Sequence, residues 1–74
     1  MNTEARVDFL VHGLVWYEKY LAKCDKNSMV HTTAGMMTWL EIQSAIDNYK
    51  NWLDTIVLEH PEVRNYVMKR MVAR

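Results

Sequence analysis

The side chains best suited to chemistry in this chain are its three histidines and its single cysteine. His12, His31 and His60 lie far apart in the sequence, with neither the His-x-x-x-His nor the paired-cysteine spacing that holds zinc. A metal site would need the tertiary structure to assemble every ligand. The simpler interpretation places His12 on the surface, His31 in a loop and His60 near a helix C-terminus, where positive charge is favourable. We therefore expect no metal and no cofactor.

The sequence also shows no pattern of residues that favours nucleophilic or acid–base catalysis. Cys24 falls in the last turn of a predicted helix, where the helix dipole disfavours a thiolate, so we expect a small buried hydrophobe. Asp47 and Asp54 are two turns apart with Lys50 between them, a spacing typical of salt bridges on an exposed helix face. The two glycines are too far apart to form a phosphate-binding loop. These observations predict a chain that is not an enzyme.

The charges balance over the whole chain but not along it. Nine acidic and nine basic residues give a net charge of 0, so no overall field favours nucleic acid. Acidic residues predominate in the middle of the chain, and we expect them to form an acidic face: Glu41, Asp47, Asp54, Glu59 and Glu62. The end of the chain is basic and offers contacts to phosphates or to an acidic partner: Arg64, Lys69, Arg70 and Arg74. The simpler interpretation is that these cations stabilise a helix C-terminus.

Two long stretches have the apolar spacing of amphipathic helices, with steps of three and four residues. The stripe in the first half consists of Val7, Leu10, Leu14, Tyr17, Leu21 and Cys24. The stripe in the second half consists of Trp39, Ile42, Ile46, Tyr49, Leu53, Ile56 and His60. Two such helices can pack side by side. The sequence therefore predicts an all-α fold, a small helical bundle of two long amphipathic helices plus a short C-terminal helix.

The helix boundaries follow from capping residues and a proline. The first helix takes Asn2 or Thr3 as its N-cap. Thr38, followed three residues later by Glu41, fits a capping box at the start of the second helix. Pro61 ends that helix and suits the first position of a third. We expect a single domain over residues 1–74, with helices at about 3–24, 38–59 and 61–73 and a loop or short turn over 25–37.

Residues 28–37 are the hardest segment to assign. β-branched residues and Gly35 disfavour a helix there, although a helix start near Thr33 is an alternative. The segment is too apolar to lie free in solvent, and flexible methionine side chains fill irregular gaps well. We expect the segment to cover the helical pair or to contact a partner through Met29, Met36 and Met37.

The first predicted helix carries a second apolar sector beside its main stripe, formed by Phe9, Gly13, Trp16 and Tyr20. The combined surface is wider than one neighbouring helix covers. Either the third helix covers the remainder, or a second copy of the chain or another partner does. Glycine inside a helix costs about 1 kcal/mol relative to alanine, and a close approach between helices is one way to offset that cost.

The short length favours oligomerisation. A domain of 74 residues buries a modest fraction of its surface, and a single cysteine excludes an intramolecular disulfide. The N-terminus lacks a signal-peptide pattern, and no apolar run is long enough to span a membrane. We expect a homodimer without membrane association in a reducing cytoplasm, which would be the host cytoplasm if a phage encodes the chain.

These patterns favour a non-enzymatic protein–protein interaction module, such as a small inhibitor or adaptor that covers a surface on a larger protein or protein–nucleic acid complex. Small anti-defence proteins of phages provide an analogy of size and composition. The first alternative is a dimeric nucleic-acid-binding regulator that uses the basic C-terminal helix. The second is a structural subunit of a larger assembly.

Overall fold

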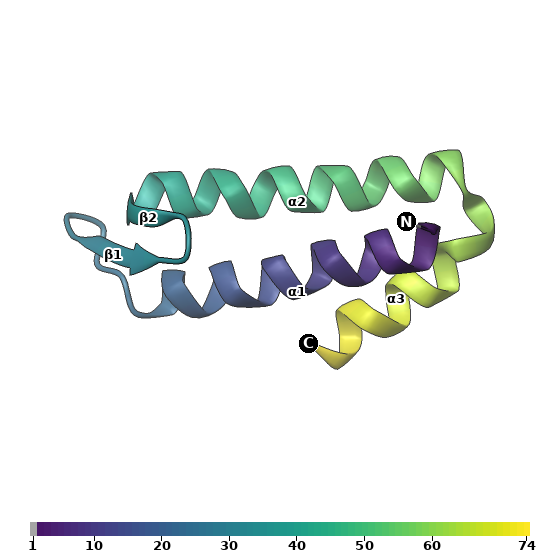
Figure 1. Ribbon diagram of the computed structural model, residues 1–74, viewed down its shortest axis with the longest axis horizontal. Coiled ribbons are helices and arrows are strands. Elements are labelled where there is room, and N and C mark those ends of the chain that lie inside the picture. Colours follow the sequence, from purple (N-terminus) through teal and green to yellow (C-terminus); the bar gives the residue numbers. More distant parts are fainter. Residues whose placement is uncertain (1) are drawn as a thin grey trace.

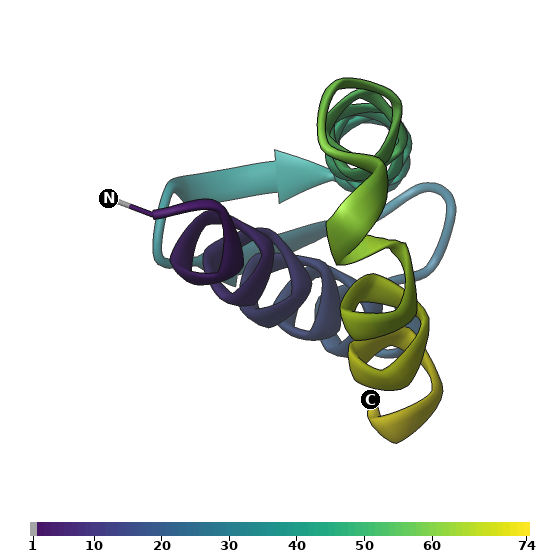
Figure 2. The same ribbon diagram turned by 90° about the vertical axis from the view of Figure 1, so that its right-hand side faces the viewer.

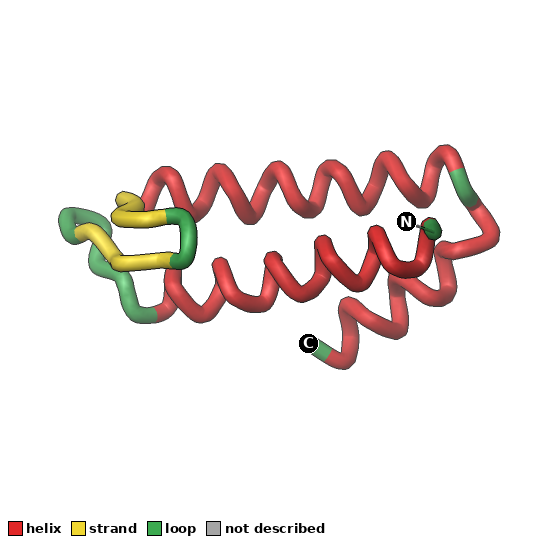
Figure 3. Tube along the Cα trace, in the orientation of Figure 1, coloured by secondary structure: helices red, strands yellow, loops and turns green. Residues whose placement is uncertain are grey.

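The computed structural model describes residues 2–74 and shows an elongated, mostly helical molecule with extents of 41 × 20 × 19 Å (Figure 1). Helix α1 spans Thr3–Ala22 and helix α2 spans Trp39–Glu59. Between them lie two short strands, β1 (Met29–Thr32) and β2 (Gly35–Thr38). The 3-10 turn η1 (Pro61–Val63) then leads into helix α3 (Arg64–Ala73). Figure 3 shows the two strands as the non-helical end of the molecule.

Helices α1 and α2 pack antiparallel and form the core between them, as the two apolar stripes predict. Val7, Leu14 and Ile42 are fully buried at this contact. The other buried apolar side chains of the two helices are Leu10, Val11, Ile46, Leu53 and Ile56. Burial of a Val, Leu or Ile side chain contributes about 1.5–3 kcal/mol, so this seam is the main source of stability.

Local hydrogen bonds fix the start of both long helices. Asn2 is the N-cap of α1, where its side-chain oxygen accepts from the backbone N–H of Ala5 at 2.7 Å. Thr38 is the N-cap of α2 and forms the expected capping box with Glu41. Helix α2 ends at Glu59, since the residue before Pro61 is disfavoured in the helical region. Pro61 begins the 3-10 turn η1 rather than an α-helix directly.

The two strands between the long helices form a β-hairpin. The sequence predicts a loop or short turn over residues 25–37, and this prediction is wrong for the strands. Strands β1 and β2 pair antiparallel, with Val30 opposite Met37 and Thr32 opposite Gly35. Gly35 has a φ of 101°, a conformation that residues with a side chain rarely adopt, and this closes the turn. The Thr32 hydroxyl donates to the Gly35 carbonyl at 2.8 Å and accepts from the Ala34 N–H at 3.1 Å. The β-branched residues that disfavour a helix here therefore form strands.

Helix α3 folds back against α1 on the side away from the hairpin, as the end-on view shows (Figure 2). Val63 and Val67 are buried and join the main core. Polar contacts complete the attachment. The Tyr66 hydroxyl donates to Asp8 at 2.7 Å, and the same carboxylate lies 3.0 Å from Arg70. At the C-terminus, Arg74 binds Glu18 at 2.9 Å.

Candidate interaction surface

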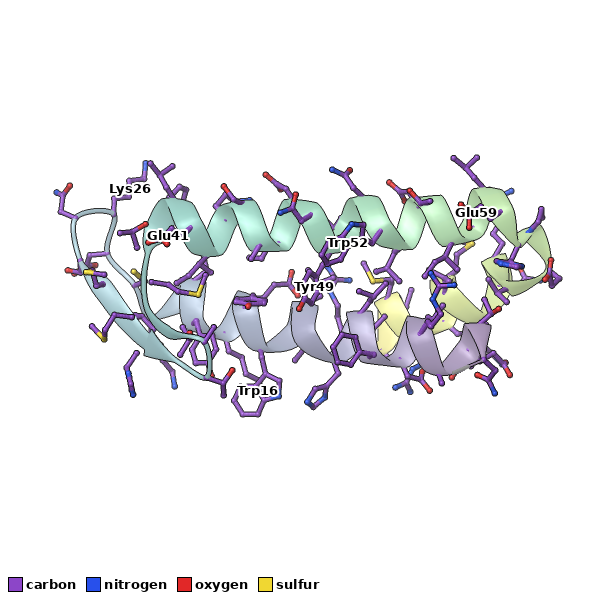
Figure 4. The ribbon with its side chains drawn as sticks, turned by 45° about the horizontal axis from the view of Figure 1, so that its top comes forward. Trp16, Lys26, Glu41, Tyr49, Trp52 and Glu59 are labelled. Carbon is purple, nitrogen blue, oxygen red and sulfur yellow. The ribbon has the colours of Figure 1, made fainter. Side chains whose placement is uncertain are left out.

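The most prominent exposed feature is a strip of aromatic side chains along one side of the α1–α2 pair. Phe9 and Trp16 on α1 are 61% and 45% exposed, and Trp52 on α2 is 52% exposed. Figure 4 shows Trp16, Tyr49 and Trp52 on the side of the molecule that faces the viewer, with α3 behind. We call this surface, made by the three exposed residues together with Tyr20 and Tyr49, the aromatic flank.

Ring contacts connect the aromatic flank across the two helices. Trp16 lies 6.1 Å from Tyr20, which lies 6.4 Å from Tyr17 between ring centroids. Tyr17 meets Tyr49 of α2 edge to face at 5.5 Å, and Tyr49 lies 5.3 Å from Trp52. Such pairs contribute about 0.5–1.5 kcal/mol beyond the area they bury. The two exposed tryptophans are therefore connected through three partly buried tyrosines, which restrict the motion of their rings.

Gly13 of α1 lies directly beside the Tyr49 ring of α2. A Cβ atom added at Gly13 would overlap the Tyr49 ring. The ring is held between Tyr17 and Trp52, so it has little room to move aside. Burial and the neighbouring Tyr17 raise the pKa of the Tyr49 phenol. The close approach that the sequence suggests for Gly13 is therefore made by an aromatic side chain.

Two hollows lie along the aromatic flank. One has a volume of about 230 Å³ and lies between Trp16, Tyr20, Tyr49 and the hairpin residue Thr33. The other has a volume of about 330 Å³ and lies at the opposite end, where Phe9 and Trp52 form its aromatic walls. Protein interfaces commonly anchor aromatic side chains in hollows of this kind.

Charged side chains border the aromatic flank with opposite signs on its two helices. Arg6 of α1 and Glu59 of α2 both line the larger hollow. The Lys19 ammonium of α1 lies 4.9 Å from the centre of the Trp16 ring. Glu41 is 18 residues before Glu59, which is five full helical turns, so both carboxylates lie on the same side of α2 (Figure 4). The α1 edge is thus cationic and the α2 edge is anionic.

Helix α3 does not cover the second apolar sector of α1. It contacts α1 at Asp8 and Glu18. Figure 4 shows α3 behind the α1–α2 pair, whereas Trp16 lies on the side that faces the viewer. Of the predicted contact residues, Gly13 and Tyr20 are partly buried against α2 and α1 itself. The open part of the sector is therefore smaller than the sequence suggests, and it is shared with Trp52.

The three methionines assigned to partner contact divide between the two faces of the hairpin. Met29 and Met36 are 51% and 54% exposed on its outer face. Met37 lies on the inner face beside Val30, and both pack against the core. The segment therefore covers the end of the helical pair with one face and presents apolar side chains with the other.

The five acidic residues predicted to form one face do not share a face, so this prediction is wrong. Asp54 lines a groove between α2 and α3 together with Arg64, whereas Glu59 lines the hollow on the opposite side of α2. Glu41 is engaged in the capping box, and Asp47 accepts a hydrogen bond from Gln43 at 3.2 Å. Glu62 lies beyond α2, with an oxygen 3.4 Å from His60. The acidic residues share a segment of sequence but point in different directions.

The basic tail is partly neutralised within the chain. Arg70 and Arg74 form the ion pairs with Asp8 and Glu18, whereas Arg64 and Lys69 form no ion pair within residues 2–74. The hydrogen bond to Glu18 raises the pKa of Arg74, and the hydrogen bond to Asp8 raises the pKa of Tyr66. The sequence shows no acidic residue after Glu62, so these partners come from residues that are distant in the chain.

The histidines and the cysteine occupy separate places. His12 accepts a hydrogen bond from the Trp16 indole at 3.0 Å, His31 is exposed on β1, and His60 caps the C-terminus of α2. Cys24 is buried, and its thiol donates to the carbonyls of Asp25 and Ser28. Within residues 2–74, no group of three or more His, Cys, Asp or Glu side chains is arranged to hold a metal ion.

The sequence analysis does not assign two residues of the aromatic flank to a binding surface, Trp52 and Tyr49. It also does not bring Arg6 and Glu59 together at one hollow. The spacing of Trp52 and Glu59, seven residues apart, places both on one side of α2 and was the available signal.

Comparison with known proteins adds no relative. No family model matches the chain, and searches of curated proteins and of solved structures find no significant match. Among the described helices, none is long and apolar enough to cross a membrane.

Proposed function

We propose that this chain is a non-enzymatic protein–protein interaction module that binds through its aromatic flank. The observation that carries the proposal is the exposure of Phe9, Trp16 and Trp52 on one side of a molecule whose core is formed elsewhere. Tryptophan and other aromatic residues dominate the binding energy of protein interfaces. The partner that covers this surface is either a second copy of the chain or a larger protein, to which the chain would bind as an inhibitor or adaptor.

The rigidity of the strip supports the same proposal. Tyr17, Tyr49 and the close approach at Gly13 hold the exposed rings against the helices. A preorganised aromatic side chain loses little conformational entropy on binding, which favours affinity. The bordering charges of Arg6 and Glu59 supply the polar rim that interfaces of this type have.

The nucleic-acid alternative has less support. Two of the four tail cations, Arg70 and Arg74, already bind carboxylates of α1. A phosphate ligand would have to displace these contacts, and only Arg64 and Lys69 would remain for counterion release. We therefore place protein binding first.

Site-specific photocrosslinking tests the proposed function. A benzophenone amino acid replaces Phe9, an exposed aromatic residue, in cells that produce the full chain. The matched control carries the same group at Lys50, which is exposed in the groove on the other side of the α1–α2 pair. We expect a polypeptide adduct at position 9 and none at position 50. Equal labelling at both positions, or no adduct at position 9, would show that the aromatic flank is not an interface.

A further inference from the structure

The larger hollow on the aromatic flank is lined by side chains whose charges are complementary to those of a second copy of the same hollow. Its α1 wall offers one cation and one aromatic ring, Arg6 and Phe9. Its α2 wall offers one anion and one aromatic ring, Glu59 and Trp52. A surface of this kind can bind a second copy of itself if symmetry brings each wall against the other wall.

Two face-to-face arrangements with two-fold symmetry are available to a pair of packed helices. In one, each helix lies on its own copy, which brings the cationic α1 edges together and the anionic α2 edges together. In the other, α1 of each protomer lies on α2 of its partner. Only the second places Arg6 opposite Glu59. Like charges brought together in an interface oppose association, so the charges select the second arrangement.

We propose that the partner of the aromatic flank is a second copy of this chain, bound in this crossed two-fold arrangement. The proposal rests on the proposed function and names its partner. Symmetry then gives each contact twice. Phe9 of each protomer lies against Trp52 of the other, and Arg6 of each pairs with Glu59 of the other.

The end of the helical pair that lies opposite the hairpin leaves room for this contact. The larger hollow lies near the start of α1 and the end of α2, whereas the hairpin stands at the opposite end of the helical pair (Figures 1 and 2). The hairpin projects on the side of the aromatic flank, so the partner approaches most closely where the hairpin is absent. The contact is therefore centred on Phe9 and Trp52.

Complementary charge reversal tests this arrangement. Arg6→Glu makes the contact anionic on both helices, and Glu59→Arg makes it cationic on both. Each variant alone should associate at least about tenfold more weakly than the native chain, because two like-charged contacts form in each dimer. Mixed in equal amounts, the two variants should form a heterodimer, since every cation then meets an anion. Native mass spectrometry distinguishes this species from either homodimer.

The controls separate association from folding. Circular dichroism establishes that each variant is folded, and Asp54→Arg reverses a charge in the groove on the other side of α2 and should leave the dimer unchanged. Mixing does not change the like charges within the hollow of each variant protomer. Dimer formation that returns on mixing therefore comes from contacts between the two chains.

Three outcomes would overturn the inference. A native chain that stays monomeric at all concentrations excludes the second copy, and a photocrosslink from position 9 to a different protein would then preserve the proposed function. A dimer that both reversals leave unchanged uses another surface. Weakened variants that fail to form a heterodimer exclude the crossed arrangement.

Discussion

The two flanks of α1 are completed in different ways. On one side, α3 covers the helix, and Asp8 and Glu18 bind Tyr66, Arg70 and Arg74 from the end of the same chain. On the other side, Phe9 and Trp16 remain exposed beside α2. The C-terminal helix α3 thus covers the more polar flank, which we call the covered flank, and leaves the aromatic flank uncovered.

The two flanks of α1 contribute to different properties, one to the stability of the folded monomer and the other to association. Residues of the covered flank stabilise the folded monomer, because their partners belong to the same chain. Residues of the aromatic flank contribute little to the monomer and gain their contacts from a second chain. Equivalent truncations on the two flanks should therefore change different measured quantities.

The largest expected effect on folding is at the covered flank. Val67→Ala removes a buried side chain of α3 and should lower the free energy of unfolding by about 1.5–2.5 kcal/mol. Trp16→Ala should change it by less than about 1 kcal/mol in dilute protein, because the indole is half exposed. Denaturant titration at low protein concentration measures both. A greater loss for Trp16→Ala than for Val67→Ala would reverse the comparison.

The next effect tests how firmly the aromatic flank is held. Helix propensity alone predicts that Gly13→Ala stabilises the chain by about 1 kcal/mol. The added methyl group would overlap the Tyr49 ring, and overpacking costs about 1–3 kcal/mol. We expect a net loss of stability, measured by thermal unfolding. A gain would mean that the ring moves freely and that the strip is not preorganised.

A smaller effect concerns the ion pair that attaches the chain end. Arg74→Ala removes the contact with Glu18, which is partly exposed to solvent, so the expected loss is about 0.5–1 kcal/mol. Salt screens this contact, and the difference from the native chain should shrink at about 1 M salt. An effect that is unchanged by salt would indicate lost packing instead.

The smallest effect is a pH dependence at Tyr66. Its hydrogen bond to Asp8 raises the pKa of the phenol in the folded state. The contribution to stability is therefore complete below the unfolded pKa of about 10 and is lost as pH rises through the folded pKa. The native chain should lose its advantage over Tyr66→Phe above about pH 10, in denaturant titrations at several pH values. A constant difference would exclude the phenol proton as the cause.

Much of this architecture is predictable from local signals. The apolar steps of three and four residues identify α1 and α2, and Thr38 with Glu41 marks the start of α2. The hairpin is harder, because each strand has four residues and the turn lacks the Asn-Gly pair that usually announces one. Val30 and Gly35 carried the relevant signal, but they were equally consistent with a loop.

The candidate surface was predictable only in part. Phe9 and Trp16 follow from the wide apolar sector of α1. Which flank α3 covers depends on the Tyr66–Asp8 contact, which joins residues 58 positions apart and leaves no local pattern. Charge counted along the sequence predicts one acidic face on α2, but the rotation of the helix places Asp54 and Glu59 on different sides.

The most direct test of the central claim is the mass of the protein in solution, measured by light scattering over a wide range of concentrations. The native chain should approach twice its 8.8 kDa mass as concentration rises. Trp52→Ala should remain a folded monomer over the same range, because it removes an exposed ring from the centre of the contact. A native chain that remains monomeric, or a Trp52→Ala variant that dimerises equally well, would contradict the assignment of the aromatic flank as a self-interface.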